Sequence, residues 1–142
     1  MIYTPMTKQA MKLSFEAHKG QKDKSGLPYA YHPFHLAEQM TDEETTIVAL
    51  LHDVAEDTDM TVDDIQKMGF SEATCDALRM LTHDEGVPYM DYVAKIKENP
   101  IAKAVKLVDL RHNSDLSRLD DVTEEDLERV EKYKAAIELL ES

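Results

Sequence analysis

The sequence predicts an all-α fold, arranged as a single-domain bundle of about seven or eight helices. Helix-start signals recur along the whole chain, where a Thr or Ser stands immediately before a proline or acidic residues. No segment shows the sustained period-two alternation that is typical of half-buried strands. The 142 residues correspond to one domain, 1–142, and neither a low-complexity linker nor an internal repeat divides them.

The helix-start signals and the breakers between them define the expected elements. Helices are expected from Thr4 to about Lys19, from Thr41, from Thr61, from Ser71, over 89–97, over 101–116 and from Thr123 to the C-terminus. The longest irregular stretch is 20–29, and ordered loops of that length often carry function. The last helix has an apolar face that would contact the core or serve an oligomer contact. That face consists of Leu127, Val130, Tyr133, Ile137 and Leu140.

Composition limits the classes of binding partner. The net charge of −13 disfavours nucleic acid and anionic membranes, so neither is expected to bind. A small anionic substrate stays compatible if a metal or a local cluster of Lys and Arg offsets this charge. The sequence has no recognisable signal peptide and no apolar run of membrane-spanning length, which makes the cytoplasm the expected compartment. The one cysteine, Cys75, is interpreted as core filler.

A first group of titratable residues follows the apolar run 47–51. His52 and Glu56 are one helical turn apart, as are Asp53 and Asp57, so the four side chains share a helix face. Carboxylates packed this closely repel one another, and a divalent cation would turn that cost into binding energy. A solvated acidic face at a helix end is the alternative interpretation.

A second group comes from the apolar segment 105–110, where Asp109 lies one turn from His112 and Asn113. A buried carboxylate needs a cation, an Arg or several donors, so Asp109 is a candidate metal ligand. A salt bridge to a remote Lys or Arg is an equally open interpretation. A third position, His32, follows the irregular stretch, where a lone histidine is more often a hydrogen-bonded structural residue than a ligand. The other histidines outside these segments, His18, His35 and His83, are interpreted as structural.

These groups supply imidazoles and carboxylates from separate helices. Such mixed ligands suit a first-row divalent ion such as Mn²⁺, Fe²⁺ or Co²⁺, and the lack of a cysteine cluster argues against structural zinc. Four protein ligands would leave coordination positions for water and substrate. Hydrolysis of a phosphate ester needs that arrangement, so a phosphohydrolase is the leading hypothesis.

The order of His32, His52-Asp53 and Asp109 resembles the H…HD…D signature of the HD superfamily. The wider sequence around these residues is similar to the RelA/SpoT-type hydrolase domain. Its three motifs correspond to the segments 18–33, 51–58 and 106–113. Their order and separations agree over most of the chain.

The resemblance implies an HD-type helical bundle and a role for each site residue. One Mn²⁺ would be bound by His32, His52, Asp53 and Asp109. Glu56 and Asp57 would hold and activate the attacking water, and Lys24, Ser25 and Asn113 would contact the substrate. The implied reaction removes the 3′-pyrophosphate from (p)ppGpp, a small nucleotide.

Two positions depart from the family pattern. Asp23 and Asp115 stand where the family usually carries Arg, and the reversed Arg-Leu order after Asp109 points Arg111 in a different direction. The two family arginines help to hold the purine nucleotide, and an Asp can neither stack on a base nor fork onto a phosphate. Two alternatives therefore stay open: an HD hydrolase for another nucleotide, of 5′-nucleotidase or phosphodiesterase type, and a non-catalytic nucleotide-binding HD module.

Overall fold

The computed structural model describes residues 1–142 and contains eight α-helices and one 3-10 helix, η1. The elements are α1 (Pro5–Ala17), α2 (Tyr31–Glu38), α3 (Glu43–Asp57), α4 (Val62–Lys67), α5 (Glu72–Leu81), α6 (Tyr89–Ile96), α7 (Pro100–Asn113), η1 (Leu116–Arg118) and α8 (Glu124–Glu141). The only β-type pairing is an isolated bridge between Lys22 and Pro28. The predicted all-α fold and the predicted number of helices are therefore confirmed.

Polar caps begin most helices close to the predicted positions. Thr4, Thr61 and Thr123 each form a capping box with the residue three positions later, and Ser71 caps α5. The helix start expected at Thr41 lies one residue later, because the N-cap of α3 is Asp42, whose side chain accepts the backbone N–H of Thr45. Local hydrogen bonds of this kind are readable from sequence, which is why these starts could be predicted.

Two boundaries differ from the prediction. Helix α2 was not predicted as an element separate from the irregular stretch, but in the structure it begins at Tyr31 and has His32 in its first turn. No side chain caps α2, so the sequence carries no start signal there. The helix expected over 101–116 ends at Asn113, because Asp115 caps the separate turn η1.

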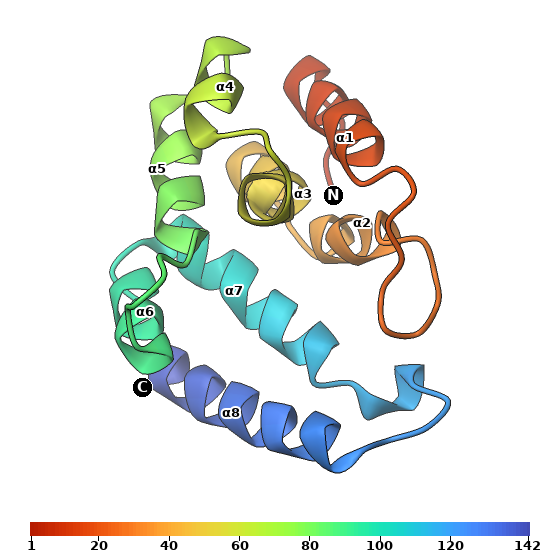
Figure 1. The fold of residues 1–142 in the computed structure, drawn as a ribbon. Coiled ribbons are helices and arrows are strands. Elements are labelled where there is room, and N and C mark those ends of the chain that lie inside the picture. The colour runs from red at the N-terminus through yellow and green to blue at the C-terminus, as the bar shows by residue number, and fades with distance from the viewer.

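Helix α3 lies at the centre of the molecule, where Figure 1 shows it nearly end-on. It packs against α1, α2, α5 and α7, and every residue from Thr45 to Val54 is buried. A connected cluster of 24 buried apolar residues includes Leu50 and Leu51 of this helix. Burial of each such leucine contributes about 2 kcal/mol. The apolar run before His52 therefore anchors the helix that carries the first group of candidate site residues.

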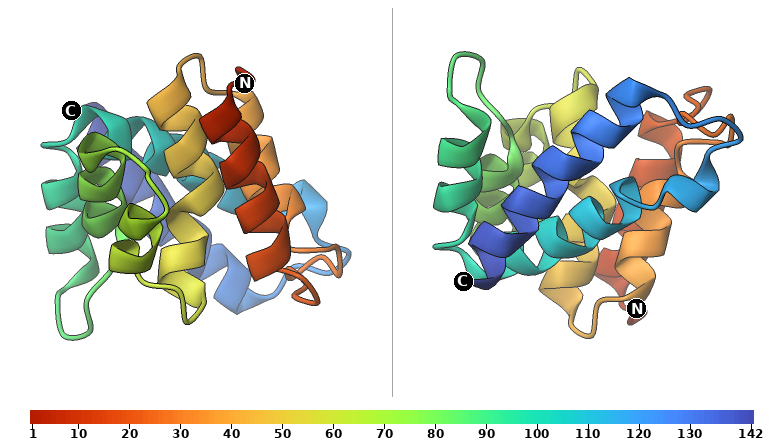
Figure 2. Two further views of the ribbon diagram at one scale, coloured as in Figure 1. Left: turned by 90° about the horizontal axis from the view of Figure 1, so that it is seen from above. Right: turned by 90° about the horizontal axis from the view of Figure 1, so that it is seen from below.

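Helix α8 packs on α6 and α7, as seen from below in Figure 2. Its residues Val130 and Leu140 are buried, in agreement with the predicted apolar face. Leu127 was expected on the same face but is 51% exposed, since it lies in the first turn of α8, at the edge of the helix packing. An oligomer contact through α8 stays a prediction. None of the helices is both long and apolar enough to span a membrane.

Two irregular segments lie side by side at one end of the bundle. The segment 18–30 joins α1 to α2, the segment 114–119 follows α7, and both views of Figure 2 show them adjacent. The side chain of Arg118 joins them, because its Nη2 lies 3.1 Å from Oδ2 of Asp23. These segments border the candidate site described next.

Candidate metal centre and substrate pocket

Four buried side chains converge where α2, α3 and α7 pack against one another. They are His32 from α2, His52 and Asp53 from α3, and Asp109 from α7. One nitrogen or oxygen atom from each lies within 4.8 Å of the others, and no member is more than 8% exposed. Three helices thus bring together the residues that the sequence resemblance assigns to a metal.

The hydrogen bonding of His52 fits a divalent cation. Its Nδ1 lies 2.9 Å from the carbonyl oxygen of Ala49, which only accepts, so Nδ1 carries a proton and Nε2 is the nitrogen that would bind a cation once it has lost its own proton. This buried Nε2 makes no hydrogen bond, although it lies 3.2 Å from Oδ1 of Asp53 and 3.5 Å from Oδ1 of Asp109. Although burial opposes protonation, these carboxylates raise the pKa of His52 to about 9. The same charges would attract a cation.

His32 is held from two sides. Its Nε2 lies 2.8 Å from Oδ1 of Asp109, and its Nδ1 lies 2.6 Å from Nδ1 of His112. Burial and the neighbouring His32 lower the pKa of His112 to about 4, so His112 is neutral near pH 7 and its ring can accept a hydrogen bond. Metal-binding histidines commonly donate their second N–H to such a partner, which fixes the ring. His112 therefore orients His32, a residue of the cluster. It lies in the third motif but was not predicted to have a role at the site.

The two carboxylates of the cluster also have partners outside it. Oδ2 of Asp109 lies 3.0 Å from Nζ of Lys106, and Oδ1 accepts a hydrogen bond from Asn113 at 3.2 Å. Although burial opposes ionisation, Lys106 and the two imidazoles hold the pKa of Asp109 well below its ordinary range. The salt bridge of Asp109 is thus formed with a lysine one turn away on the same helix and not with a remote Lys or Arg, while its other oxygen faces the cluster, so its role as a metal ligand stays a prediction.

Asp53 accepts a hydrogen bond from the hydroxyl of Tyr29, with an O–O distance of 2.7 Å. Burial, and next the charge of Asp53, raise the pKa of Tyr29, so the phenol stays protonated and remains a donor. Tyr29 was not predicted to contact the cluster residues. Only the tertiary packing joins it to a residue 24 positions away.

The four-residue face expected on α3 divides into two parts. His52 and Asp53 are buried in the cluster, whereas Glu56 and Asp57 lie one turn further on and are exposed. Oε2 of Glu56 accepts the backbone N–H of His83 at 3.0 Å. Burial raises the pKa of both exposed carboxyls, and neighbouring carboxylates raise them further. Glu56 and Asp57 therefore stand beside the cluster rather than in it.

A cavity of about 530 Å³ adjoins the cluster. Its lining residues are Lys22, Asp23, Lys24, Ser25, Tyr29, Asp57, Asn113, Asp115, Arg118, Leu119, Arg129 and Tyr133. The predicted substrate residues Lys24, Ser25 and Asn113 thus line one space, together with Tyr29 and Asp57 beside the cluster. Four of the lining side chains are cationic and three, Asp23, Asp57 and Asp115, are acidic, so the cavity wall has a small excess of positive charge on a chain of net charge −13.

Two of these cations, Arg118 and Arg129, were not predicted as site residues. Neither belongs to the three motifs, and no local spacing connects them to the cluster. Arg129 forms an ion pair with Asp126 in the first turns of α8, and Arg118 bonds to Asp23. They line the cavity because tertiary packing places η1 and the start of α8 around the same space as the segment 18–30.

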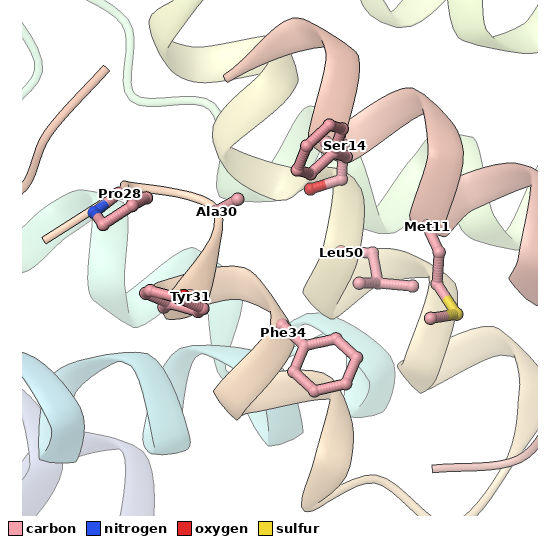
Figure 3. Close-up of a pocket in the computed structure, with 8 residues that line it drawn as sticks. Met11, Ser14, Pro28, Ala30, Tyr31, Phe34 and Leu50 are labelled. Carbon is pink, nitrogen blue, oxygen red and sulfur yellow. The ribbon is translucent and has the colours of Figure 1, made fainter. Parts of the chain in front are cut away.

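A second cavity, of about 380 Å³, lies between α1 and α2 and is mainly apolar. Figure 3 shows Met11, Tyr31, Phe34 and Leu50 among its lining residues. No acidic, basic or imidazole side chain lines it. This second cavity therefore offers no charged or imidazole group for the candidate chemistry.

Several known proteins are similar to this chain, although no family model matches it. The guanosine-3′,5′-bis(diphosphate) 3′-pyrophosphohydrolase MESH1 of Mus musculus is 37% identical, over 73% of this chain and 66% of its own. MESH1 of Danio rerio is 31% identical, over 81% of this chain and 71% of its own. The guanosine-3′,5′-bis(diphosphate) 3′-pyrophosphohydrolase of Aquifex aeolicus is 33% identical over 89% of this chain, which spans only 18% of that protein.

A solved structure agrees with these sequence matches. It is described as a metazoan ortholog of SpoT that hydrolyses ppGpp, and it superposes with a TM-score of 0.78 at 25% identity. The match covers 99% of this chain and 88% of that one, which confirms the HD-type helical fold. The chain is thus a hydrolase by family, and it belongs to the MESH1 and SpoT family of guanosine-3′,5′-bis(diphosphate) 3′-pyrophosphohydrolases.

Proposed function

We propose that the chain removes the 3′-pyrophosphate from (p)ppGpp and uses one Mn²⁺ ion to do so. One observation carries the proposal: a buried cluster of two imidazoles and two carboxylates adjoins a cavity lined by four cations. Metal-assisted hydrolysis of a phosphate ester needs a cation position next to an anion-binding space. Relatives named for the same reaction support this choice of substrate.

The cluster residues would hold the ion through nitrogen and oxygen donors, which suit Mn²⁺. These residues are His32, His52, Asp53 and Asp109. Bound there, a divalent cation supplies a Lewis acid at the phosphoryl group and lowers the pKa of a coordinated water. A backbone carbonyl orients His52, and the ring of His112 orients His32, so the donor atoms are fixed before any ligand arrives.

Glu56, aided by Asp57, would take the proton from the attacking water. Their raised pKa values make both carboxylates stronger bases than freely solvated ones, and such matching favours general base catalysis near neutral pH. The backbone N–H of His83 binds one oxygen of Glu56, which orients the group. Attack on phosphorus would break its bond to the 3′ oxygen and release pyrophosphate and GDP from ppGpp.

The cavity side chains would hold the nucleotide. Lys24 and Lys22 are exposed at the cavity and would offset phosphate charge. Asn113 would donate a hydrogen bond to the ribose or phosphates, and the Ser25 hydroxyl, whose proton is donated to Asp23, would accept one from the ribose. Asn113 also donates to Oδ1 of Asp109, so it would join the substrate contacts to the metal centre.

A second candidate function is hydrolysis of a different nucleotide by the same metal chemistry. The observation that favours it is the presence of Asp23 and Asp115 in the cavity wall, at positions where the family usually has Arg. Carboxylates there disfavour the binding of a polyanion. A panel of nucleoside phosphates and cyclic nucleotides, with phosphate and pyrophosphate release as readout, would separate the two functions.

The first experiment incubates the purified protein with Mn²⁺ and ppGpp and quantifies GDP and pyrophosphate, with Asp53→Ala as the control. Release of both products by the wild type alone is the expected result. Absence of turnover by a wild type that retains Mn²⁺ would remove ppGpp as the substrate and leave the second candidate. Nucleotide binding without turnover on any substrate of the panel would instead indicate a non-catalytic module.

A further inference from the structure

The two carboxylates that replace family arginines are both used to build the cavity wall. Oδ1 of Asp23 accepts the backbone N–H groups of Ser25 and Leu27, at 2.9 and 3.0 Å, and the Ser25 hydroxyl at 2.6 Å. Burial opposes ionisation, but these hydrogen bonds and the nearby Arg118 together lower the pKa of Asp23. Asp23 is therefore an ionised carboxylate that stabilises the turn 23–27 by accepting hydrogen bonds from Ser25 and Leu27.

Asp115 has a comparable structural role on the other segment. Its Oδ1 accepts hydrogen bonds from the backbone N–H of Ser117, at 3.1 Å, and from the Ser117 hydroxyl. Asp115 thereby caps the N-terminus of η1. The short turn that Asp115 begins carries Arg118 at its last position. Asp115 thus begins η1 directly after α7, and this turn places Arg118 within hydrogen-bond distance of Asp23 in the segment 18–30.

Arg118 is fixed at the cavity by two acceptors on different segments. Its Nη1 donates to the carbonyl oxygen of His112 at 2.9 Å, and its Nη2 donates to Oδ2 of Asp23 at 3.1 Å. The side chain is 24% exposed and lines the cavity. Arg111 differs, because it pairs on the surface with Glu141 and does not line the cavity.

We propose that Arg118 takes the place of the missing arginines and provides the surface on which the nucleobase stacks. Two of the five guanidinium N–H groups donate to protein acceptors, which fixes the plane of the group at the cavity, and its charge is partly balanced by Asp23, so the planar face is the contact assigned to the ligand. A guanidinium held flat stacks on a base and loses little conformational freedom when it does so. Asp23 is then a positioning residue for Arg118. This inference rests on the proposed function, since it assumes a nucleotide in this cavity.

The test compares Arg118→Met and Arg118→Lys with the wild type and with Arg111→Met as the matched control. The measurements are kcat and KM for ppGpp with Mn²⁺, the Kd of GDP by calorimetry, and inhibition by inorganic pyrophosphate. Circular dichroism and Mn²⁺ binding check that each variant is folded. We expect Arg118→Met to raise KM and the GDP Kd roughly tenfold, with kcat, Mn²⁺ binding and pyrophosphate inhibition nearly unchanged.

The lysine variant distinguishes stacking from a simple charge contact. Lysine keeps the positive charge but has no planar face, so we expect it to bind GDP as weakly as the methionine variant does. Wild-type affinity in Arg118→Lys, or weaker pyrophosphate inhibition in Arg118→Met, would overturn stacking because either result assigns Arg118 to phosphate. An effect of equal size in Arg111→Met would overturn the assignment to Arg118.

The outcomes also separate this inference from the proposed function. Hydrolysis of ppGpp with an unchanged KM in Arg118→Met would overturn the inference and leave the function standing. A wild type that binds GDP but does not hydrolyse ppGpp, and whose GDP affinity depends on Arg118, would support the inference and contradict the function. A wild type that neither hydrolyses ppGpp nor binds GDP overturns both.

Discussion

The metal centre and the adjoining cavity differ in burial and in their relation to the family pattern. All four residues of the centre are at most 8% exposed, and each matches the HD signature. The cavity is lined largely by the loop segments 18–30 and 114–119, and it departs from the family pattern at Asp23 and Asp115. The comparison indicates that packed helices hold the proposed metal ligands, whereas the residues proposed to bind the substrate lie largely on loops, which tolerate change more readily.

The cost of a substitution explains this difference. Removal of one partner from a buried charged group leaves the others unpaired, which typically costs about 3–5 kcal/mol. The loop position 23 is more tolerant, because a carboxylate there forms hydrogen bonds within its own loop and pairs with Arg118. The negative charge of Asp23, at a position where the family usually has Arg, is thus balanced by Arg118, 95 positions later. In the buried cluster, no solvent-exposed loop can supply a new partner in this way after a substitution.

The largest effect is expected at the metal centre, from Asp53→Ala. The substitution removes one donor of the cluster and the acceptor of Tyr29, so Mn²⁺ retention and turnover should be lost together. Elemental analysis of the dialysed protein and ppGpp hydrolysis measure the two losses. A Mn²⁺ concentration of 100 Kd should also stabilise the wild type by about 2.7 kcal/mol, and this gain should disappear in the variant.

Asp63→Ala is the matched control for this experiment. Asp63 is an exposed carboxylate in the first turn of α4 that pairs with Arg79, and it lines neither cavity near α3. Its removal should leave Mn²⁺ binding and turnover unchanged. Wild-type turnover by a verified metal-free Asp53→Ala protein would contradict the assignment of the reaction to the buried centre.

A smaller but still large effect is expected from Glu56→Gln, at the border between the two regions. Loss of the general base should lower kcat by roughly 10²–10⁴-fold, while Mn²⁺ binding persists because Glu56 lies outside the cluster. The amide oxygen of glutamine can still accept the N–H of His83, so the local fold should hold. Steady-state kinetics and Mn²⁺ titration give the two quantities. An equal loss of Mn²⁺ affinity would instead make Glu56 part of the centre.

The helices were predictable from sequence to the extent that their starts depend on local contacts. Thr61 and Thr123 bond to residues three positions away, and such pairs are visible in the sequence. The start of α2 was not predictable, because no side chain caps it and its position depends on packing against α3 and α7. The break after Asn113 required recognition of a second cap, Asp115, inside an apparently continuous helix.

The candidate site shows the same limit. Spacing grouped His52 with Glu56 on one helix face, but it could not show that one would be buried and the other exposed. The set of four cluster residues came from the family resemblance, and the structure brings these residues together. The contact of Tyr29 with Asp53 was missed because it joins distant segments through tertiary packing.

A moderate effect is expected from Tyr29→Phe, which tests how the loop supports the centre. Loss of the 2.7 Å hydrogen bond leaves the Asp53 carboxylate less well oriented, so the Mn²⁺ affinity should fall by about 10–100-fold. Calorimetric titration with Mn²⁺ measures this change, and Tyr3→Phe, at a 64% exposed tyrosine, is the control. Unchanged Mn²⁺ affinity in Tyr29→Phe would show that α3 alone orients Asp53.

The smallest effect is expected in the pH dependence of catalysis. Burial raises the pKa of Glu56, the N–H of His83 opposes this, and the charge of Asp57 raises it further. The ionised form of Glu56 is lost as the pH falls through this raised pKa. The acid limb of the kcat profile should therefore lie at a higher pH than the ordinary pKa of a glutamate.

Asp57→Asn removes one of the charges that raise the pKa of Glu56. The acid limb of its kcat profile, normalised to its own maximum, should therefore move to lower pH, by less than about one unit. The measurement is the kcat–pH profile of the wild type and of Asp57→Asn at one saturating Mn²⁺ concentration. If the acid limb of the variant's profile stays in place or moves to higher pH, the group that titrates there is not Glu56.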